Sequence, residues 1–142
     1  MASTKRMIVE WQGNYRLEAK NEQGITVKFD APKAYGGEET ALSPMENVLA
    51  SLAACSSFHV LTILRKKRQK VTGYLVEATA ERRDESPRVF TRIHLKYIVK
   101  GENISPQAVD SAIRLSEEKY CSVGGMLKKA VDITSSFEII NE

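Results

Sequence analysis

An uncharged stretch from Val48 to Leu64 constrains the fold of this chain more than any other feature. The basic residues Arg65 to Arg68 follow it directly, and Ser43, Pro44 and Glu46 precede it. Serine, proline and glutamate at this spacing predict a capping box at the first turn of a helix. Basic residues are favoured at the last turn, where the helix dipole attracts cations. Because the stretch is apolar on most faces, we expect one long helix buried in the core.

A membrane span is the main alternative for this stretch, and its length is at the short limit for one. Polar residues interrupt it, namely Ser51, Ser56, Ser57, His59 and Thr62. The N-terminal residues lack the apolar region and cleavage site of a secretory signal. We therefore expect a cytoplasmic protein with no membrane partner. In that reducing compartment two cysteines are expected to stay thiols rather than form a permanent bridge.

The chain has 142 residues, of which 42% are hydrophobic and 27% are charged. These values are typical of one globular domain, which we expect to span residues 1–142. The net charge of +3 is too small to indicate a nucleic-acid partner. The basic run after Leu64 has no interleaved aromatic residues, so a solvated helix end explains it.

The remaining pattern predicts strands in groups rather than in alternation with helices. Three short strands are expected at 7–11, 15–20 and 25–29, and a glycine-containing loop, 30–42, leads into the long helix. A long hairpin follows at 74–82 and 89–99, then an amphipathic helix from Ser105 to about Tyr120, a short helix after Cys121 and a last strand at 131–140. This order is typical of an α+β fold.

Cys55 and Cys121 are the only cysteines, and they are too far apart in sequence for a CxxC redox turn or a zinc knuckle. His59 and His94 are the only histidines, which argues against a metal site. Cys121 lies at an expected helix start, where free backbone N–H groups lower the pKa of a thiol. From composition alone, the two cysteines fit either inert core residues or a redox pair.

Several motifs together carry a family resemblance. They are Ser43-Pro44-Met45-Glu46, then Ala53-Ala54-Cys55, and Lys119-Tyr120-Cys121-Ser122-Val123 ahead of the last strand. With the grouped strands, they make nearly the whole chain resemble the OsmC/Ohr family of osmotically inducible and organic hydroperoxide resistance proteins. The resemblance implies two β-sheets wrapped around two central helices in an intertwined homodimer.

The same resemblance implies a thiol-dependent peroxidase that reduces organic hydroperoxides. Cys55 would be the peroxidatic thiol and would become a sulfenic acid. Cys121 would resolve it as a disulfide, which an external dithiol reduces. This chemistry requires no metal, haem or flavin cofactor. The substrate pocket is expected at the dimer interface, with Met45, Phe58 and Met126 as candidate lining residues.

Two charged residues complete the predicted site, and both depart from the family pattern. A glutamate directly follows the proline in well-characterised members, whereas here Met45 intervenes and Glu46 is one place later. Glu46 therefore fits either the site or the cap of Ser43. The expected loop arginine is also absent, so Arg16 is the candidate cation, with Lys33 second. Such departures are similar to the less characterised branch of the family.

Two other functions stay open from the sequence. One is a small-molecule-binding or stress-associated protein that keeps the fold and the cysteines with little turnover, which the departures at Glu46 and Arg16 favour. The other is acyl transfer by Cys55, activated by His59 four residues later on the same helix face.

Overall fold

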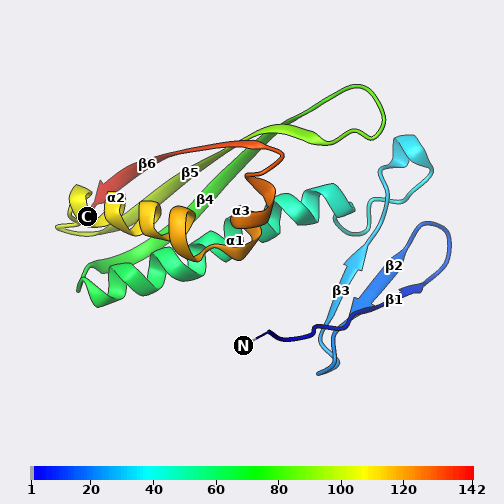
Figure 1. The fold of residues 1–142 in the computed structure, drawn as a ribbon, viewed down its shortest axis with the longest axis horizontal. Coiled ribbons are helices and arrows are strands. Elements are labelled where there is room, and N and C mark those ends of the chain that lie inside the picture. Colours follow the sequence, from blue (N-terminus) through cyan, green and yellow to red (C-terminus); the bar gives the residue numbers. More distant parts are fainter. Residues whose placement is uncertain (1) are drawn as a thin grey trace. The chain divides into compact units, whose positions relative to one another are not determined.

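Grouped strands and helices follow one another in the computed structural model, which describes residues 2–142 (Figure 1). The chain folds as two compact units, the first ending at Val48 and the second beginning at Leu49. Each unit contains one three-stranded sheet. The predicted α+β class and the predicted order of elements are both confirmed.

The first unit contains an antiparallel sheet of three short strands, β1 (Ile8–Trp11), β2 (Leu17–Lys20) and β3 (Thr26–Phe29), in that order. The turn between β1 and β2 uses Gly13 and Asn14, both with positive φ. A short 3₁₀ helix, η1 (Lys33–Tyr35), follows in the loop after β3. The three predicted strands are therefore present, each slightly shorter than expected.

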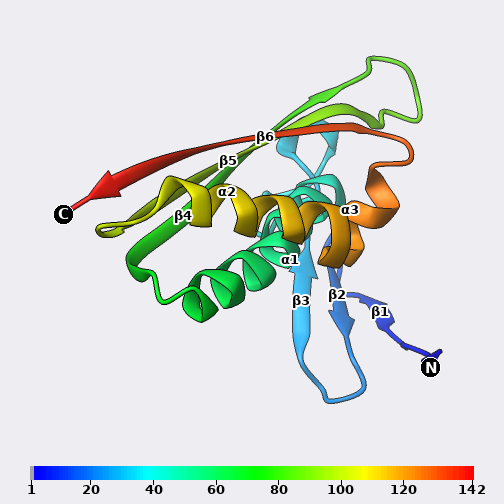
Figure 2. The same cartoon turned by 60° about the vertical axis from the view of Figure 1, so that its left-hand side comes forward.

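The second unit contains the long hairpin and the helices. Its strands are β4 (Lys70–Arg82), β5 (Phe90–Glu102) and β6 (Asp132–Asn141), with β5 antiparallel to β4 and parallel to β6. The long helix α1 (Pro44–Lys66) begins in the first unit, and α2 (Pro106–Leu115), the π-helical turn η2 (Ser116–Tyr120) and α3 (Ser122–Leu127) follow β5. The two views in Figures 1 and 2 show the helices on one face of this sheet.

The core of the second unit lies between β5 and the helices. Three elements supply most of its buried side chains, which include Ile93, Leu95, Tyr97 and Val99 of β5, Leu52, Ser56, Val60 and Leu64 of α1, and Val109, Ala112 and Ile113 of α2. Residues two apart on a strand share a face, and residues three or four apart on a helix share a stripe. The buried positions follow these two periods, so the hydrophobic pattern sets how the elements pack.

The sequence predicts that α1 is buried in the core, and the structure buries it along one stripe only, formed by Leu52, Ser56, Val60 and Leu64. Phe58 is 72% exposed and Leu61 is 37% exposed, whereas Leu64 is fully buried. Within residues 2–142, α1 is the one helix long and apolar enough to cross a membrane, a criterion that the core helix of a soluble protein also meets. The hydroxyl of Ser56 hydrogen-bonds to Tyr97 of the sheet. This bond and the buried stripe favour a core helix.

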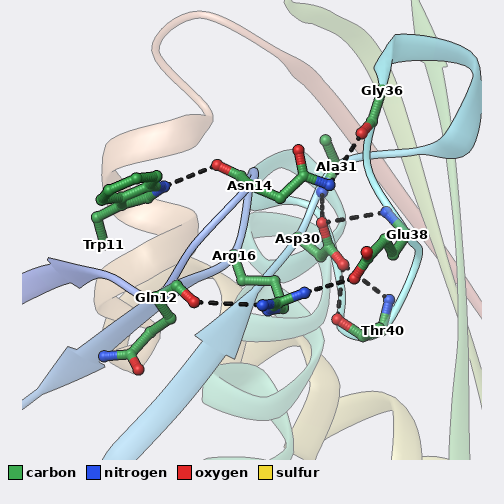
Figure 3. A network of polar contacts seen from close by, with 9 residues as sticks. All are labelled: Trp11, Gln12, Asn14, Arg16, Asp30, Ala31, Gly36, Glu38 and Thr40. Carbon is green, nitrogen blue, oxygen red and sulfur yellow. Dashed lines mark hydrogen bonds and ion pairs between the residues drawn. The ribbon is translucent and has the colours of Figure 1, made fainter.

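Asp30 fixes the loop between β3 and α1. Its carboxylate accepts hydrogen bonds from the Thr40 hydroxyl at 2.6 Å, the Thr40 N–H at 3.0 Å and the Ala31 N–H at 2.7 Å (Figure 3). The bonds from Thr40 are the main cause that lowers the pKa of Asp30 to about 2. The loop is thus a defined structure, in which Gly37 packs against the backbone of Ala31.

We predict that Gly37→Ala destabilises the first unit by about 1–3 kcal/mol. A Cβ atom at Gly37 would lie 1.9 Å from the carbonyl oxygen of Ala31, so the backbone must move. Urea unfolding followed by the fluorescence of Trp11, the single tryptophan of the chain, measures this loss. Gly125→Ala is the control, because a Cβ there meets nothing within 4 Å. Equal unfolding midpoints for both variants would contradict the prediction.

Candidate active site

Cys55 lies on α1 beside the buried stripe that packs against the sheet. Its neighbour Ser56 is fully buried, whereas Cys55 itself is half-buried. The small residues Ala53 and Ala54 precede it on the helix. The helix therefore holds this thiol at the edge of the core, where a small reagent can reach it.

Cys121 lies between the π-helical turn and α3. Its N–H donates to the carbonyl of Ser116 at 2.7 Å, which closes the wide turn. Its Sγ caps α3 by accepting the N–H of Gly124 at 3.3 Å. A side chain at Gly124 would touch both this sulfur, at 3.3 Å, and Leu52 of α1, at 3.4 Å. The glycine thus allows the Cys121 segment to pack directly against α1.

The two thiols meet in the second unit. The Cys55 thiol lies close enough to Cys121 to raise the pKa of the Cys121 thiol, and both are free cysteines. Of the four predicted catalytic residues, these two are brought together. A pair of adjacent thiols of this kind can be oxidised to a disulfide and reduced again.

The pKa of Cys121 is not lowered as the helix start predicts. Burial raises it to about 11, because removal from water disfavours the thiolate, and the N–H of Gly124 offsets this only in part. The neighbouring Cys55 and the charge of Glu117 raise it further. The expectation from the helix start was wrong because only 5% of Cys121 is exposed.

A cavity of about 210 Å³ opens beside Cys121. Apolar side chains from three elements form one part of its lining, and charged side chains near Cys121 form another; the lining consists of Leu52, Ser56, Leu95, Glu117, Glu118, Cys121, Gly124, Lys128 and Ile133. Met45, Phe58 and Met126 were predicted to line a pocket at the dimer interface, and they are not among the residues that line this cavity. Phe58 and Met126 are 72% and 68% exposed, and their place at a dimer interface stays a prediction.

A chain of hydroxyl groups connects this cavity to the core. The hydroxyl of Tyr97 lies 2.5 Å from Ser56 Oγ and donates to Glu117 Oε2 at 2.9 Å. Burial is the main cause that raises the pKa of Tyr97, so this phenol stays protonated as a donor. Ser135 of β6 donates to Glu117 Oε1 at 3.0 Å. Both oxygens of the Glu117 carboxylate are therefore held.

Sequence reasoning missed Glu117 and its hydroxyl partners. The expected helix from Ser105 to Tyr120 is α-helical only to Leu115 and then widens into the π-helical turn. A π turn adds a residue and rotates the face that the following side chains present. Helical spacing therefore could not place Glu117, although a carboxylate four residues before Cys121 was a visible signal.

Glu46 forms the predicted capping box. Its carboxylate accepts the N–H of Ser43 at 3.0 Å, and its own N–H donates to Ser43 Oγ at 3.3 Å. These bonds to Ser43 lower the pKa of Glu46. The cap accounts for this residue, and its predicted role at a thiol stays a prediction.

Arg16 lies in the first unit, within the polar network of Figure 3. Its guanidinium pairs with Glu38 at 2.5 Å and donates to the carbonyl of Gln12 at 3.3 Å. Lys33, the second candidate, begins η1 in the same unit. Arg16 thus already has a carboxylate partner in Glu38, and its role at the Cys55 thiol stays a prediction.

His59 faces Tyr120, the residue before Cys121. The two rings stack with centroids 5.5 Å apart and an angle of 22° between their planes. The other histidine, His94, has both ring nitrogens within hydrogen-bonding distance of hydroxyls, at 2.7 Å from Thr134 and 2.9 Å from Ser136. Among residues 2–142, no group of three His, Cys, Asp or Glu side chains could hold a metal ion.

Comparisons with known proteins give close matches. The sequence model of the family described as OsmC-like protein matches residues 36–136. Protein YhfA of Escherichia coli strain K12 is 50% identical over 132 residues, which cover 93% of this chain and 96% of YhfA. The crystal structure of a hypothetical protein from Aquifex aeolicus has a TM-score of 0.87 at 30% identity and covers 99% of both chains.

A third match carries a functional description. The crystal structure of an organic hydroperoxide resistance protein OsmC from Legionella pneumophila, also described as a predicted redox protein, has a TM-score of 0.70. The two chains are 14% identical, with 97% of this chain and 98% of that chain covered. At this identity the likeness shows the fold alone.

Proposed function

Because this chain belongs to the OsmC-like family, we propose that it is a thiol-dependent peroxidase that reduces organic hydroperoxides. Cys55 is the peroxidatic thiol and Cys121 the resolving thiol. The observation that carries this proposal is the proximity of the two thiols beside a partly apolar cavity. The description of the Legionella pneumophila protein as an organic hydroperoxide resistance protein supports the same substrate class.

Burial supports this order of the two cysteines. A thiolate is the nucleophile in peroxide reduction, and Cys121 is 5% exposed, with a pKa raised to about 11. The half-buried Cys55 is the more accessible of the two. Cys55 is therefore assigned the first step, and Cys121 the second.

Each step has a defined balance. The Cys55 thiolate attacks the hydroperoxide, the S–O bond forms and the O–O bond breaks, and the leaving alkoxide takes a proton to become an alcohol. The Cys121 sulfur then attacks the sulfenic sulfur, the S–S bond forms and the S–O bond breaks, and water leaves. An external dithiol reduces the disulfide and restores both thiols.

Two charged residues keep the roles predicted from the sequence as part of this proposal. Arg16 is the candidate cation for the Cys55 thiolate, and Glu46 is its candidate partner. In the first unit these side chains are bound to Glu38 and Ser43. If either residue stabilises the Cys55 thiolate only weakly, the second candidate function is favoured, which is a binding or stress-associated protein with little turnover.

We propose a cytoplasmic homodimer as the working form of the protein. The exposed apolar residues on α1, Phe58 at 72% and Leu61 at 37%, support association through this helix. Large apolar side chains exposed together on one element are a common mark of a protein interface.

We predict that the purified protein consumes cumene hydroperoxide catalytically when dithiothreitol is supplied as the dithiol. Consumption should be faster than that of hydrogen peroxide at equal concentration, because Leu52, Leu95 and Ile133 give the cavity apolar lining. A peroxide assay over time measures both rates, with dithiothreitol alone as the control. If both thiols remain alkylatable after stoichiometric cumene hydroperoxide, the protein is not a peroxidase and the binding function is favoured.

A further inference from the structure

Glu117 lies where a proton acceptor for Cys121 is needed. The two residues line the same cavity, and the carboxylate is close enough for its charge to raise the pKa of the thiol. Tyr97 and Ser135 donate to its two oxygens, so the carboxylate is oriented from the core side. Its exposure is intermediate, so it can also exchange a proton with water in the cavity.

The resolving step creates the need for a base. With its pKa raised to about 11, the Cys121 group is almost entirely in the protonated thiol form at pH 7. The thiol form is a poor nucleophile, because the thiolate is the species that attacks. A general base that takes the proton during the attack removes this barrier, and such catalysis typically contributes about 10²–10⁴-fold.

We propose that Glu117 is the general base that removes the proton from Cys121 during disulfide formation. The Cys121 S–H proton moves to the Glu117 carboxylate, directly or through one water, as the S–S bond to Cys55 forms. In the peroxidase reaction the S–O bond of the sulfenic acid breaks, and Glu117 returns the proton to the leaving hydroxide as water. This proposal rests on the proposed function in one respect, which is that the leaving group is the hydroxide of a sulfenic acid on Cys55.

Other ionisable groups surround this pair. Glu118 and Lys128 line the cavity with it, Cys55 neighbours Cys121, and Tyr97 donates to Glu117 from β5. Tyr74 lies behind Tyr97, with ring centroids 6.5 Å apart, and burial raises its pKa to about 12. Both phenols are therefore neutral at pH 7–9, and Glu117 and Glu118 are the two carboxylates that line the cavity.

A mixed disulfide tests the base without any hydroperoxide. Dithiodipyridine places a pyridylthio group on Cys55 and releases one thiopyridone, and attack by Cys121 then releases the second. The Cys121→Ser protein, which can release only the first, identifies the loading step. We expect Glu117→Gln to slow the second release by at least about 100-fold at pH 7. Its rate should then rise about tenfold per pH unit toward the thiol pKa, whereas the wild-type rate changes little from pH 7 to 9.

Two further variants separate a base from a structural residue. Glu117→Asp keeps a carboxylate and should restore part of the rate with the pH profile of the wild type. Glu138→Gln, which removes an exposed carboxylate of β6 outside the cavity lining, should leave the rate unchanged. A second release from Glu117→Gln at the wild-type rate, or a reduced rate with the wild-type pH profile, would overturn the proposal. Wild-type protein that shows this Glu117 dependence but consumes no hydroperoxide would keep the base and lose the peroxidase function.

Discussion

Replacing Cys55 with serine is expected to reduce hydroperoxide consumption to the background rate, because no other thiol is accessible enough for the first step. Without added dithiol, the Cys121→Ser protein should instead stop after one turnover, with a sulfenic acid left on Cys55. Stopped-flow peroxide loss measures the first step, and dimedone trapping followed by mass spectrometry locates the sulfenic acid.

The two variants also test which cysteine has which role. If Cys55→Ser retains single-turnover reduction while Cys121→Ser loses it, the two cysteines have the opposite roles. If both single variants and the double variant keep the same turnover above background, the chemistry lies outside these thiols.

Replacing Leu64 with alanine is expected to destabilise the second unit by about 2–5 kcal/mol, because this side chain is fully buried and its loss leaves a cavity. Leu61→Ala on the same helix is the matched control, since its side chain is 37% exposed and should cost much less. Urea unfolding followed by far-UV circular dichroism measures both losses, at concentrations where sedimentation gives all proteins the same oligomeric state.

These two leucines separate the two faces of α1. We expect Leu64→Ala to change the unfolding free energy and Leu61→Ala to weaken self-association, as read by sedimentation. Equal losses of unfolding free energy for the two variants would contradict the assignment of the Leu64 stripe as the core face.

The local signals in the sequence were strong enough to predict most elements. The capping box of Ser43 and Glu46 marked the start of α1, and Ser105 with Pro106 marked the start of α2. The alternation of apolar and polar residues predicted the β4–β5 hairpin, because successive side chains on a strand point to opposite faces. These features depend on neighbours in the sequence, so no knowledge of the tertiary structure was needed.

The surroundings of the thiols could not be predicted in the same way. The proximity of Cys55 to Cys121 was expected only from a family resemblance, since sequence spacing says nothing about residues so far apart. The raised pKa of Cys121 depends on burial, which the helix-start argument ignored. The position of Glu117 depends on a π-helical turn, where the α-helical period fails.

The measurement that tests the central claim most directly is disulfide mapping after oxidation. Wild-type protein is treated with one equivalent of cumene hydroperoxide, free thiols are blocked by alkylation, and the peptides are separated without reduction. We expect Cys55 and Cys121 to be recovered as one intramolecular disulfide that dithiothreitol reverses. Recovery of both cysteines as alkylated thiols, or of Cys55 linked to a second copy of itself, would contradict the account.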